Sequence, residues 1–264
     1  SPSPVLPCSH RFHASCVDEL RKAGVQEVCP LCRAKLPATA EKMFADGCTI
    51  YFAISKRVQQ DVDGAWRALS RGEQREIDRM VQLWEGVAKQ GHAKAQYNLG
   101  VIYYDGHGVK QDYSKAREWW EKAAKQEYAD AQYNLGAMYS EGQGVKQDYS
   151  KAREWYEKAA KQEHASAQFN LGIMYDQGQG VKQDYSKARE WWEKAAKQEH
   201  AGAQSNLGVM YENGDGVEQS DSLAMRWYGR AAAQGHDQAK QGCERIIQKR
   251  REEKAKDRQG GGEK

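Results

Sequence analysis

Proline and cysteine are scarce in this 264-residue sequence and are concentrated near its start. All 5 prolines lie at or before Pro37, and four of the 6 cysteines lie at or before Cys32. Long hydrophobic runs are missing as well, since no stretch approaches the roughly 20 apolar residues that a membrane-spanning helix needs. The sequence therefore predicts no membrane span, and it predicts a domain boundary near residues 37–39.

An excess of charge of one sign is also absent, because 40 Lys and Arg stand against 37 Asp and Glu. A nucleic-acid-binding domain usually carries a basic stripe, whereas here the signs interleave, so we expect no nucleic-acid partner. Asn-x-Ser/Thr glycosylation sites are missing, which favours a cytoplasmic or nuclear location. Neither Met nor a secretion signal stands at Ser1, so we expect a piece of a longer protein.

What the sequence does contain is a 36-residue unit that occurs four times in succession. The copies begin at Ala93, Ala129, Ala165 and Ala201. Residues 108–127 recur letter for letter at 180–199. A fixed period of this size predicts a repeat array, in which each unit buries its apolar face only against its neighbours.

Each unit carries the signals of two helices. The first copy has a helical pattern over Ala93–Tyr104, followed by Gly106, which can take the left-handed conformation that ends a helix. Asp112 is a good N-cap for a second helix. Gly100 recurs in the middle of every first helix, at a cost of roughly 1 kcal/mol against Ala. Its recurrence predicts a close helix crossing.

The pattern A-x-A-Q-Y-N-L-G-x-x-Y…G-x-G-V…A-x-x-W-x-x-K-A-A resembles the Sel1-like repeat, a relative of the tetratricopeptide repeat. The resemblance implies an all-α, right-handed solenoid of helix-turn-helix pairs whose first helices line a concave face. Family members hold other proteins together, including parts of ubiquitin-ligase assemblies, so we expect a protein or peptide partner. The repeats are expected at residues 93–128, 129–164, 165–200 and 201–236.

The first helices of the four copies differ mainly at positions expected to face this groove. The aromatic residues there form a series that ends at Ser205, and we predict that the series anchors a peptide or a partner's helix. The alternative is that the same side chains form the core between repeats. The groove residues we single out are Tyr97, Val101, Tyr104, Tyr133, Phe169 and Ile173.

Other recurring residues have structural interpretations. His92, His164, His200 and His236 close their units in register, which favours a helix-end role over metal binding. The Trp pairs of the second helices are expected in the core. No set of side chains in the repeats is arranged for catalysis.

The segments that flank the array are expected to be helical. Residues 38–92 are interpreted as a degenerate first repeat with a lengthened loop, in which Ser70 and Glu73 form a capping box and Trp84 aligns with Trp120. Residues 237–258 should form a C-terminal capping helix, because a solenoid end needs a polar cover. Residues 259–264 should be a disordered tail.

Residues 1–37 concentrate zinc-ligand residue types in short pairs. Zinc prefers four tetrahedral sulfur or imidazole ligands, and pairs such as Cys-x-His and Cys-x-x-Cys present two of them on one turn. The alternatives are disulfides or free thiols. The candidate ligands are Cys8, His10, His13, Cys16, Cys29 and Cys32.

The spacing Cys-x-His-x2-His-x2-Cys-x12-Cys-x2-Cys and the ending CPLCR resemble the C-terminal part of a RING finger of the two-histidine subclass. The resemblance implies that Cys8, His10, Cys29 and Cys32 share one zinc ion. His13 and Cys16 would be half of a second site, whose other pair precedes the third ligand in that family and is not found here. Either the chain begins inside the domain or this site has decayed.

The same resemblance implies a surface for a ubiquitin-conjugating enzyme. Leu20 and Pro30 match its hydrophobic contacts, and Arg33 matches the arginine that holds ubiquitin against its carrier enzyme. The alternatives are packing of Leu20 on its own helix and a solvated surface charge at Arg33. A RING supplies no attacking side chain and acts by positioning the loaded carrier.

The sequence therefore favours a zinc-binding adaptor that serves as a RING-type ubiquitin ligase or ligase component, with the repeats choosing the client. The rival interpretation is a non-enzymatic Sel1-repeat scaffold whose zinc knuckle is purely structural.

Overall fold

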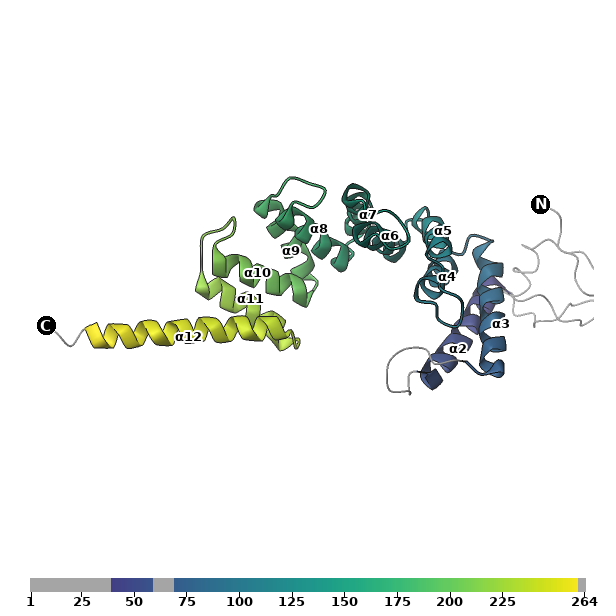
Figure 1. Cartoon of the computed structure of the whole chain (residues 1–264), viewed down its shortest axis with the longest axis horizontal. Helices are drawn as coiled ribbons and strands as arrows, with labels where there is room; N and C mark the ends of the chain where they lie inside the picture. Colours follow the sequence, from purple (N-terminus) through teal and green to yellow (C-terminus); the bar gives the residue numbers. More distant parts are fainter. Residues whose placement is uncertain (1–38, 59–68, 261–264) are drawn as a thin grey trace, which may run out of the picture. The chain divides into compact units, whose positions relative to one another are not determined.

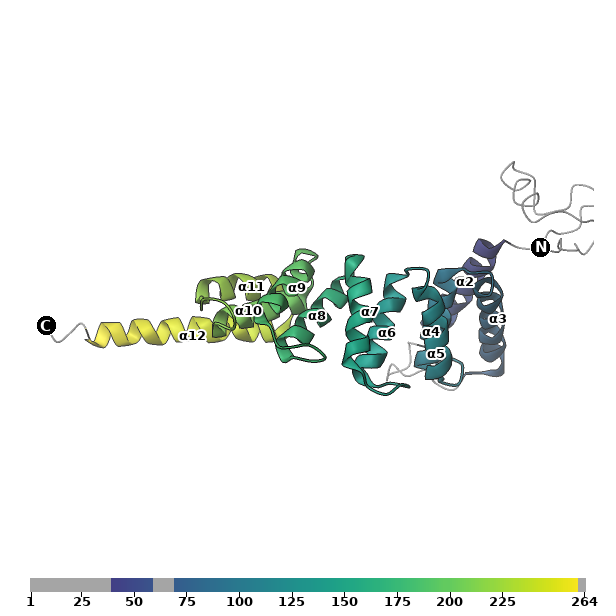
Figure 2. The ribbon, with the colours of Figure 1, turned by 90° about the horizontal axis from the view of Figure 1, so that it is seen from above.

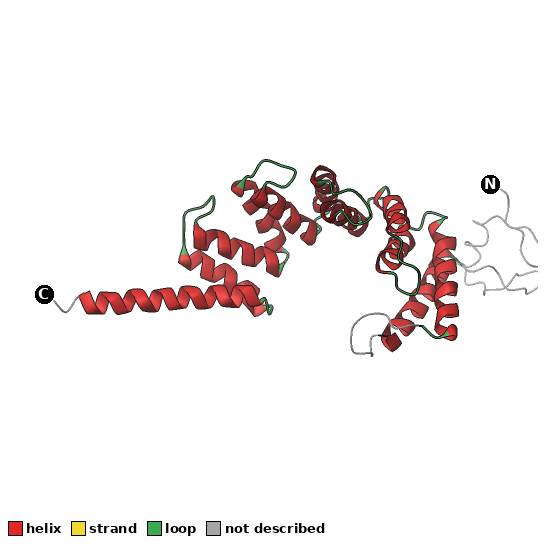
Figure 3. Cartoon of the chain, viewed as in Figure 1, coloured by secondary structure: helices red, strands yellow, loops and turns green. Residues whose placement is uncertain are grey.

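The computed structural model describes residues 39–58 and 69–260, and the regular elements within these residues are all α-helices (Figure 3). The chain divides into two compact units between Trp119 and Trp120, inside one helix. Each unit is described by itself.

Unit 1 contains a pair of helices before the first repeat and the start of that repeat (Figure 1). Its helices are α2 (Ala40–Val58), α3 (Arg71–Ala88), α4 (Ala93–Asp105) and the first part of α5 (Tyr113–Ala124). The predicted capping box is confirmed, since the Glu73 amide donates to Ser70 Oγ and the Ser70 amide donates to Glu73 Oε2. Both the start and the register of α3 therefore follow from residues 70–73.

Unit 2 contains the remaining helices, which follow one another as pairs joined by loops (Figures 1 and 2). They are α6 (Ala129–Glu141), α7 (Tyr149–Lys161), α8 (Ala165–Gln177), α9 (Tyr185–Lys197), α10 (Ala201–Asn213), α11 (Asp221–Ala233) and α12 (Asp237–Gly260). Within each repeat the first helix packs against the second, and each second helix packs against the next first helix. This nearest-neighbour packing is that of a repeat array.

The helix ends are fixed by the residues that the repeat supplies. Gly142 has a φ of 73° and caps α6 in the left-handed conformation, which glycine adopts without steric cost. Asp148 then opens α7 by accepting a hydrogen bond from the Lys151 amide at 3.0 Å. Equivalent capping residues recur in the other repeats, so the lengths of the loops and the spacing of the helices repeat with the sequence.

The recurring glycine of the first helices allows the predicted close crossing, and what crosses it is an aromatic ring of the second helix. A Cβ on Gly136 would lie 2.6 Å from the Tyr156 ring, and one on Gly172 would collide with Trp192. Gly47 of α2 meets the Trp84 ring of α3 in the same way. The pair α2–α3 thus packs by the same contact as the repeats.

A glutamine buried in each first helix of unit 2 links consecutive helix pairs. Gln168 Nε2 donates to the Ala160 carbonyl at 3.3 Å, and its Oε1 accepts from Gln198 Nε2 at 2.9 Å. Gln132 and Gln204 make the equivalent bonds. Because a buried amide without partners is costly, this network fixes the register of each repeat on the previous one.

Helix α12 closes the array at its C-terminal end. Ala239 and Ile246 are buried in a cluster with Tyr228 of α11, and Gly242 lies against the Tyr228 ring. The residues from Ile247 to Lys256 are exposed, and in Figure 2 the helix continues well past its partners in unit 2. Its first half therefore covers the end of the array.

Candidate functional site

The candidate binding surface of unit 2 is the solvent side of its first helices, α6, α8 and α10, which we call the first-helix face. Its residues recur at intervals of one repeat, are partly or fully exposed, and alternate with buried neighbours. They are Asp130, Asn134, Ala137 and Glu141 on α6, then Ser166, Asn170, Ile173 and Gln177 on α8, then Gly202, Asn206, Val209 and Asn213 on α10.

Tyr133 and Phe169 lie at the border between this face and the core. The Tyr133 ring centroid is 4.8 Å from His164 and 5.7 Å from Tyr156. Phe169 stacks on His200 at 4.6 Å. Both aromatic residues are partly buried and pack against core clusters, and both keep partial exposure.

The other predicted groove residues also keep partial exposure. Ile173 packs in part on the core around Trp192. Tyr97 and Val101 are partly exposed on α4, and Tyr104 meets Tyr113 edge-on at 5.2 Å. Ser205, where the aromatic series ends, is buried.

The histidines at the ends of the repeats cap the helix that begins the following repeat, which confirms their predicted helix-end role. His164 Nδ1 accepts a hydrogen bond from the Ala167 amide at 3.2 Å, and its Nε2 lies 3.2 Å from Asp130 Oδ1. The equivalent caps are made by His92, His200 and His236. Tyr128 takes this position before α6 and makes no side-chain cap. The caps and the aromatic stacks together join neighbouring first helices.

The buried glutamines and the ring over each glycine are features that the sequence analysis missed. Gln96, Gln132, Gln168 and Gln204 recur between a buried alanine and a buried leucine. The sequence contained a signal for these glutamines, because a polar residue that recurs at the same position of an apolar helix face needs buried hydrogen-bond partners.

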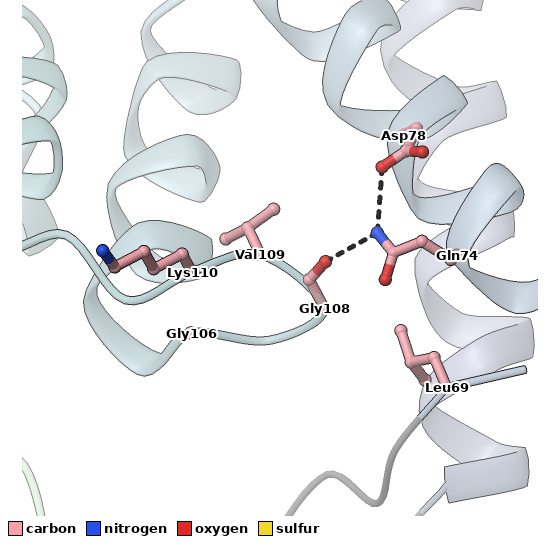
Figure 4. A pocket seen from close by; sticks show the side chains of 7 residues that line it. All are labelled: Leu69, Gln74, Asp78, Gly106, Gly108, Val109 and Lys110. Atoms are coloured by element: carbon pink, nitrogen blue, oxygen red, sulfur yellow. Dashed lines mark hydrogen bonds between the residues drawn. The ribbon is translucent and has the colours of Figure 1, made fainter. Parts of the chain in front are cut away.

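Unit 1 has a shallow depression between α3 and the loop that follows α4 (Figure 4). Its volume is about 540 Å³, and Gln74 Nε2 spans it by donating to the Gly108 carbonyl at 3.0 Å and to Asp78 Oδ1 at 2.9 Å. Leu69 and Val109 supply its apolar lining. Asp78 and Gln74 bond each other and the loop, so this depression presents no assembled reactive group.

The predicted zinc ligands and enzyme-contact residues lie outside the described residues. These are Cys8, His10, His13, Cys16, Cys29 and Cys32, together with Leu20, Pro30 and Arg33. Across residues 39–58 and 69–260, no three His, Cys, Asp or Glu side chains gather where they could hold a metal ion. In the same part of the chain no helix combines the length and the apolarity needed to cross a bilayer.

Paired helices, nearest-neighbour packing and a 36-residue register define the class of this protein as an all-α helix-turn-helix solenoid. The family model of the Sel1 repeat matches residues 93–128, 129–164, 165–200 and 201–236, which is more than half of the chain, so the chain belongs to the Sel1 repeat family. The Ring finger domain model matches residues 1–33. The RING domain implies zinc binding.

Known proteins resemble the two parts of the chain separately. The RING-H2 finger protein ATL34 of Arabidopsis thaliana is 42% identical over 57 residues, which are 22% of this chain and 16% of that protein. The chain thus spans a small fraction of this relative.

The structural relatives are Sel1 repeat proteins. A Sel1 repeat protein from Oxalobacter formigenes superposes with a TM-score of 0.61 and 28% identity, over 83% of this chain and 84% of that one. The protective antigen c5321 of uropathogenic Escherichia coli superposes with a TM-score of 0.61 and 33% identity, over 77% of this chain and 42% of that one. The two parts together define a zinc-binding, protein-interaction architecture.

Proposed function

We propose that this protein is a RING-type ubiquitin-ligase adaptor whose repeats hold a client and whose N-terminal zinc module recruits a ubiquitin-conjugating enzyme. The observation that carries the proposal is the Ring finger match over residues 1–33, which contains six zinc-ligand residues at two-histidine spacing. Its fusion to a Sel1 array supplies the second half, since such arrays present extended surfaces to protein partners.

In this proposal Cys8, His10, Cys29 and Cys32 hold one zinc ion, and His13 and Cys16 contribute to a second site. The donor set fits zinc, because thiolates and imidazoles in short pairs are its preferred ligands. Zinc supplies folding free energy to this segment and takes no part in the transfer.

The conjugating enzyme docks on Leu20 and Pro30 in this proposal, and Arg33 holds ubiquitin in a reactive orientation. Arginine suits the last role because its planar, forked donors can bridge two backbones at once. The gain in rate comes from positioning, since no side chain of this chain attacks the thioester. A reducing cytoplasmic or nuclear location agrees with thiolate ligation.

Autoubiquitination with a panel of conjugating enzymes tests the ligase half. The zinc-loaded wild-type chain should form ubiquitin conjugates, and Arg33→Ala should lose most of them while keeping its zinc content. Lys35→Ala, a second cation two residues away, is the matched control and should remain active. Zinc-loaded protein that is inactive with every enzyme of the panel would favour the rival function, a scaffold with a structural zinc knuckle.

Client capture tests the proposed role of the repeats in holding a client protein. The proposed client surface includes Tyr97, Val101, Tyr104, Tyr133, Phe169 and Ile173. Replacing Tyr97, Tyr133 and Phe169 with Ala should abolish client pull-down while the circular dichroism spectrum stays helical. A loss of helicity would assign these rings to the packing between repeats.

A further inference from the structure

The first helices of unit 2 carry acidic residues and no basic ones. Helices α6, α8 and α10 contain Asp130, Glu141, Asp176 and Glu212 and no Lys or Arg. Each of α7 and α9 carries four basic and two acidic residues. The loops after α6 and α8 each add one lysine and one aspartate, whereas the loop after α10 adds Asp215 and Glu218 and no basic residue. The first helices of unit 2 are therefore acidic, and the loop after α10 adds further negative charge.

The chain shows how one of these carboxylates is neutralised. Glu212 accepts hydrogen bonds from Arg245 at 2.9 and 3.3 Å and from the Tyr228 hydroxyl at 2.6 Å. Arg245 belongs to α12, which packs where a further first helix would begin. A guanidinium presented by a neighbouring segment thus occupies this position at the end of the array.

Asp176 holds the same register one repeat earlier and lacks such a partner. Burial and then the nearby Asp215 carboxylate raise the pKa of Asp176 above its ordinary value. No lysine or arginine in the described part of the chain forms an ion pair with Asp176 or with Glu141. A cation at this position would relieve the repulsion between Asp176 and Asp215.

The area between these acids offers apolar and hydrogen-bonding contacts. Val209 is 39% exposed, as Leu223 is on α11, and Ile173 has the same register as Val209 on α8. Asn134, Asn170 and Asn206 recur beside them at one-repeat intervals, and Asn170 already bonds the Tyr133 and Tyr156 side chains. Side-chain amides both donate and accept, so Asn134 and Asn206 can pair with the backbone of an extended peptide.

We infer that the first-helix face of unit 2 receives an extended, basic segment of the client, with an Arg or Lys side chain against Asp176, as Arg245 lies against Glu212 one repeat later, and apolar side chains on Ile173 and Val209. The inference rests on the proposed function, because it names the chemistry of the partner that the repeats hold. Charge complementarity selects a basic segment over an acidic or neutral one.

Three labelled 12-residue peptides test this inference by fluorescence anisotropy with the full chain. One repeats Gly-Arg-Leu, the second has citrulline in place of Arg, and the third has Glu. The Arg peptide should bind at least about tenfold more tightly than the citrulline peptide, and its binding should weaken as salt is raised.

Matched variants locate the binding surface. Glu141→Gln with Asp176→Asn removes two acids from the first helices of unit 2 and should weaken binding of the Arg peptide about tenfold. Glu154→Gln with Glu190→Gln removes two exposed acids from α7 and α9 and should leave it unchanged. Equal loss in both double variants would mean diffuse charge attraction and would overturn the inference.

Other outcomes separate this inference from the proposed function. Equal binding of the citrulline peptide, or no binding of any peptide, would overturn the basic-segment inference alone, provided that ubiquitin transfer and client capture persist. Specific binding of the Arg peptide without ubiquitin transfer would support the inference and count against the ligase half of the proposed function.

Discussion

At the scale of single residues, glutamate occupies a backbone conformation that glycine adopts more easily. Glu127, Glu163 and Glu199 have φ values near 60°. Glycines, Gly91 and Gly235, occupy the equivalent position in the flanking helix pairs. The left-handed region costs a side-chain-bearing residue roughly 1–2 kcal/mol. Three of the helix-pair junctions are therefore strained.

Replacing Glu163 with Gly should stabilise the array by about 1 kcal/mol, because the strain is removed and only part of the gain is lost to the entropy of the unfolded chain. Thermal unfolding followed by circular dichroism measures the effect. Glu154→Gly, inside α7, is the control and should destabilise by a similar amount. A lower melting temperature for Glu163→Gly would contradict the strain argument.

A second residue-scale consequence concerns His200. Burial lowers the pKa of its ring below the ordinary 6.5, and the neighbouring His164 and His236 add to this shift. The neutral ring accepts the Ala203 amide through Nδ1, and a proton there would remove the cap and place a positive charge at a helix N-terminus.

Stability should therefore fall as the pH drops below about 6.5, because the unfolded chain takes up a proton that the folded chain resists. At higher pH both states are neutral at this residue, and its contribution is constant. His200→Asn keeps a capping acceptor without titrating near neutrality. Melting temperatures between pH 5 and 8 should fall less steeply for this variant, and an unchanged slope would show that His200 is not responsible.

At the scale of the helix pair, the recurring glycines decide how closely two helices pack. Gly172→Ala should destabilise by about 1–3 kcal/mol, because the added methyl group collides with Trp192 and overpacking outweighs the gain in helix propensity. Gly229→Ala in α11 is the control, since nothing lies within 4 Å of the added Cβ. It should stabilise by up to about 1 kcal/mol. Urea unfolding of both variants compares the two, and stabilisation by Gly172→Ala would contradict the close crossing.

Much of the helix pair could be predicted from the sequence, for reasons visible in particular residues. Gly106, Asp112 and the Ser70–Glu73 box act through local geometry, so their spacing alone places helix ends. Gly47 and Trp84 are separated by a lengthened loop, so their contact has no fixed spacing to reveal it. The partial exposure of Tyr133 and Phe169 depends on how the next helix packs, and periodicity alone could not say whether these rings face a partner or the core.

At the scale of the whole molecule, the repeats and the proposed zinc module should depend on different interactions for their stability. The repeat cores contain alanines, a leucine, a methionine, large aromatic residues and hydrogen-bonded glutamines. Removing zinc with a strong chelator should therefore abolish ubiquitin transfer and leave the helical circular dichroism nearly unchanged. Complete unfolding in chelator would show that the repeats depend on the metal.

Tyr128 makes one junction unlike the others. The Ala131 amide bonds only the Tyr128 carbonyl, whereas the Ala167 amide has both a carbonyl and an imidazole as acceptors. In native-state hydrogen exchange the first-turn amides of α6 should accordingly exchange sooner than those of α8, and Tyr128→His should slow their exchange. Local unfolding of unit 2 would then begin at residue 128, at the start of α6, while the later helix pairs remain folded.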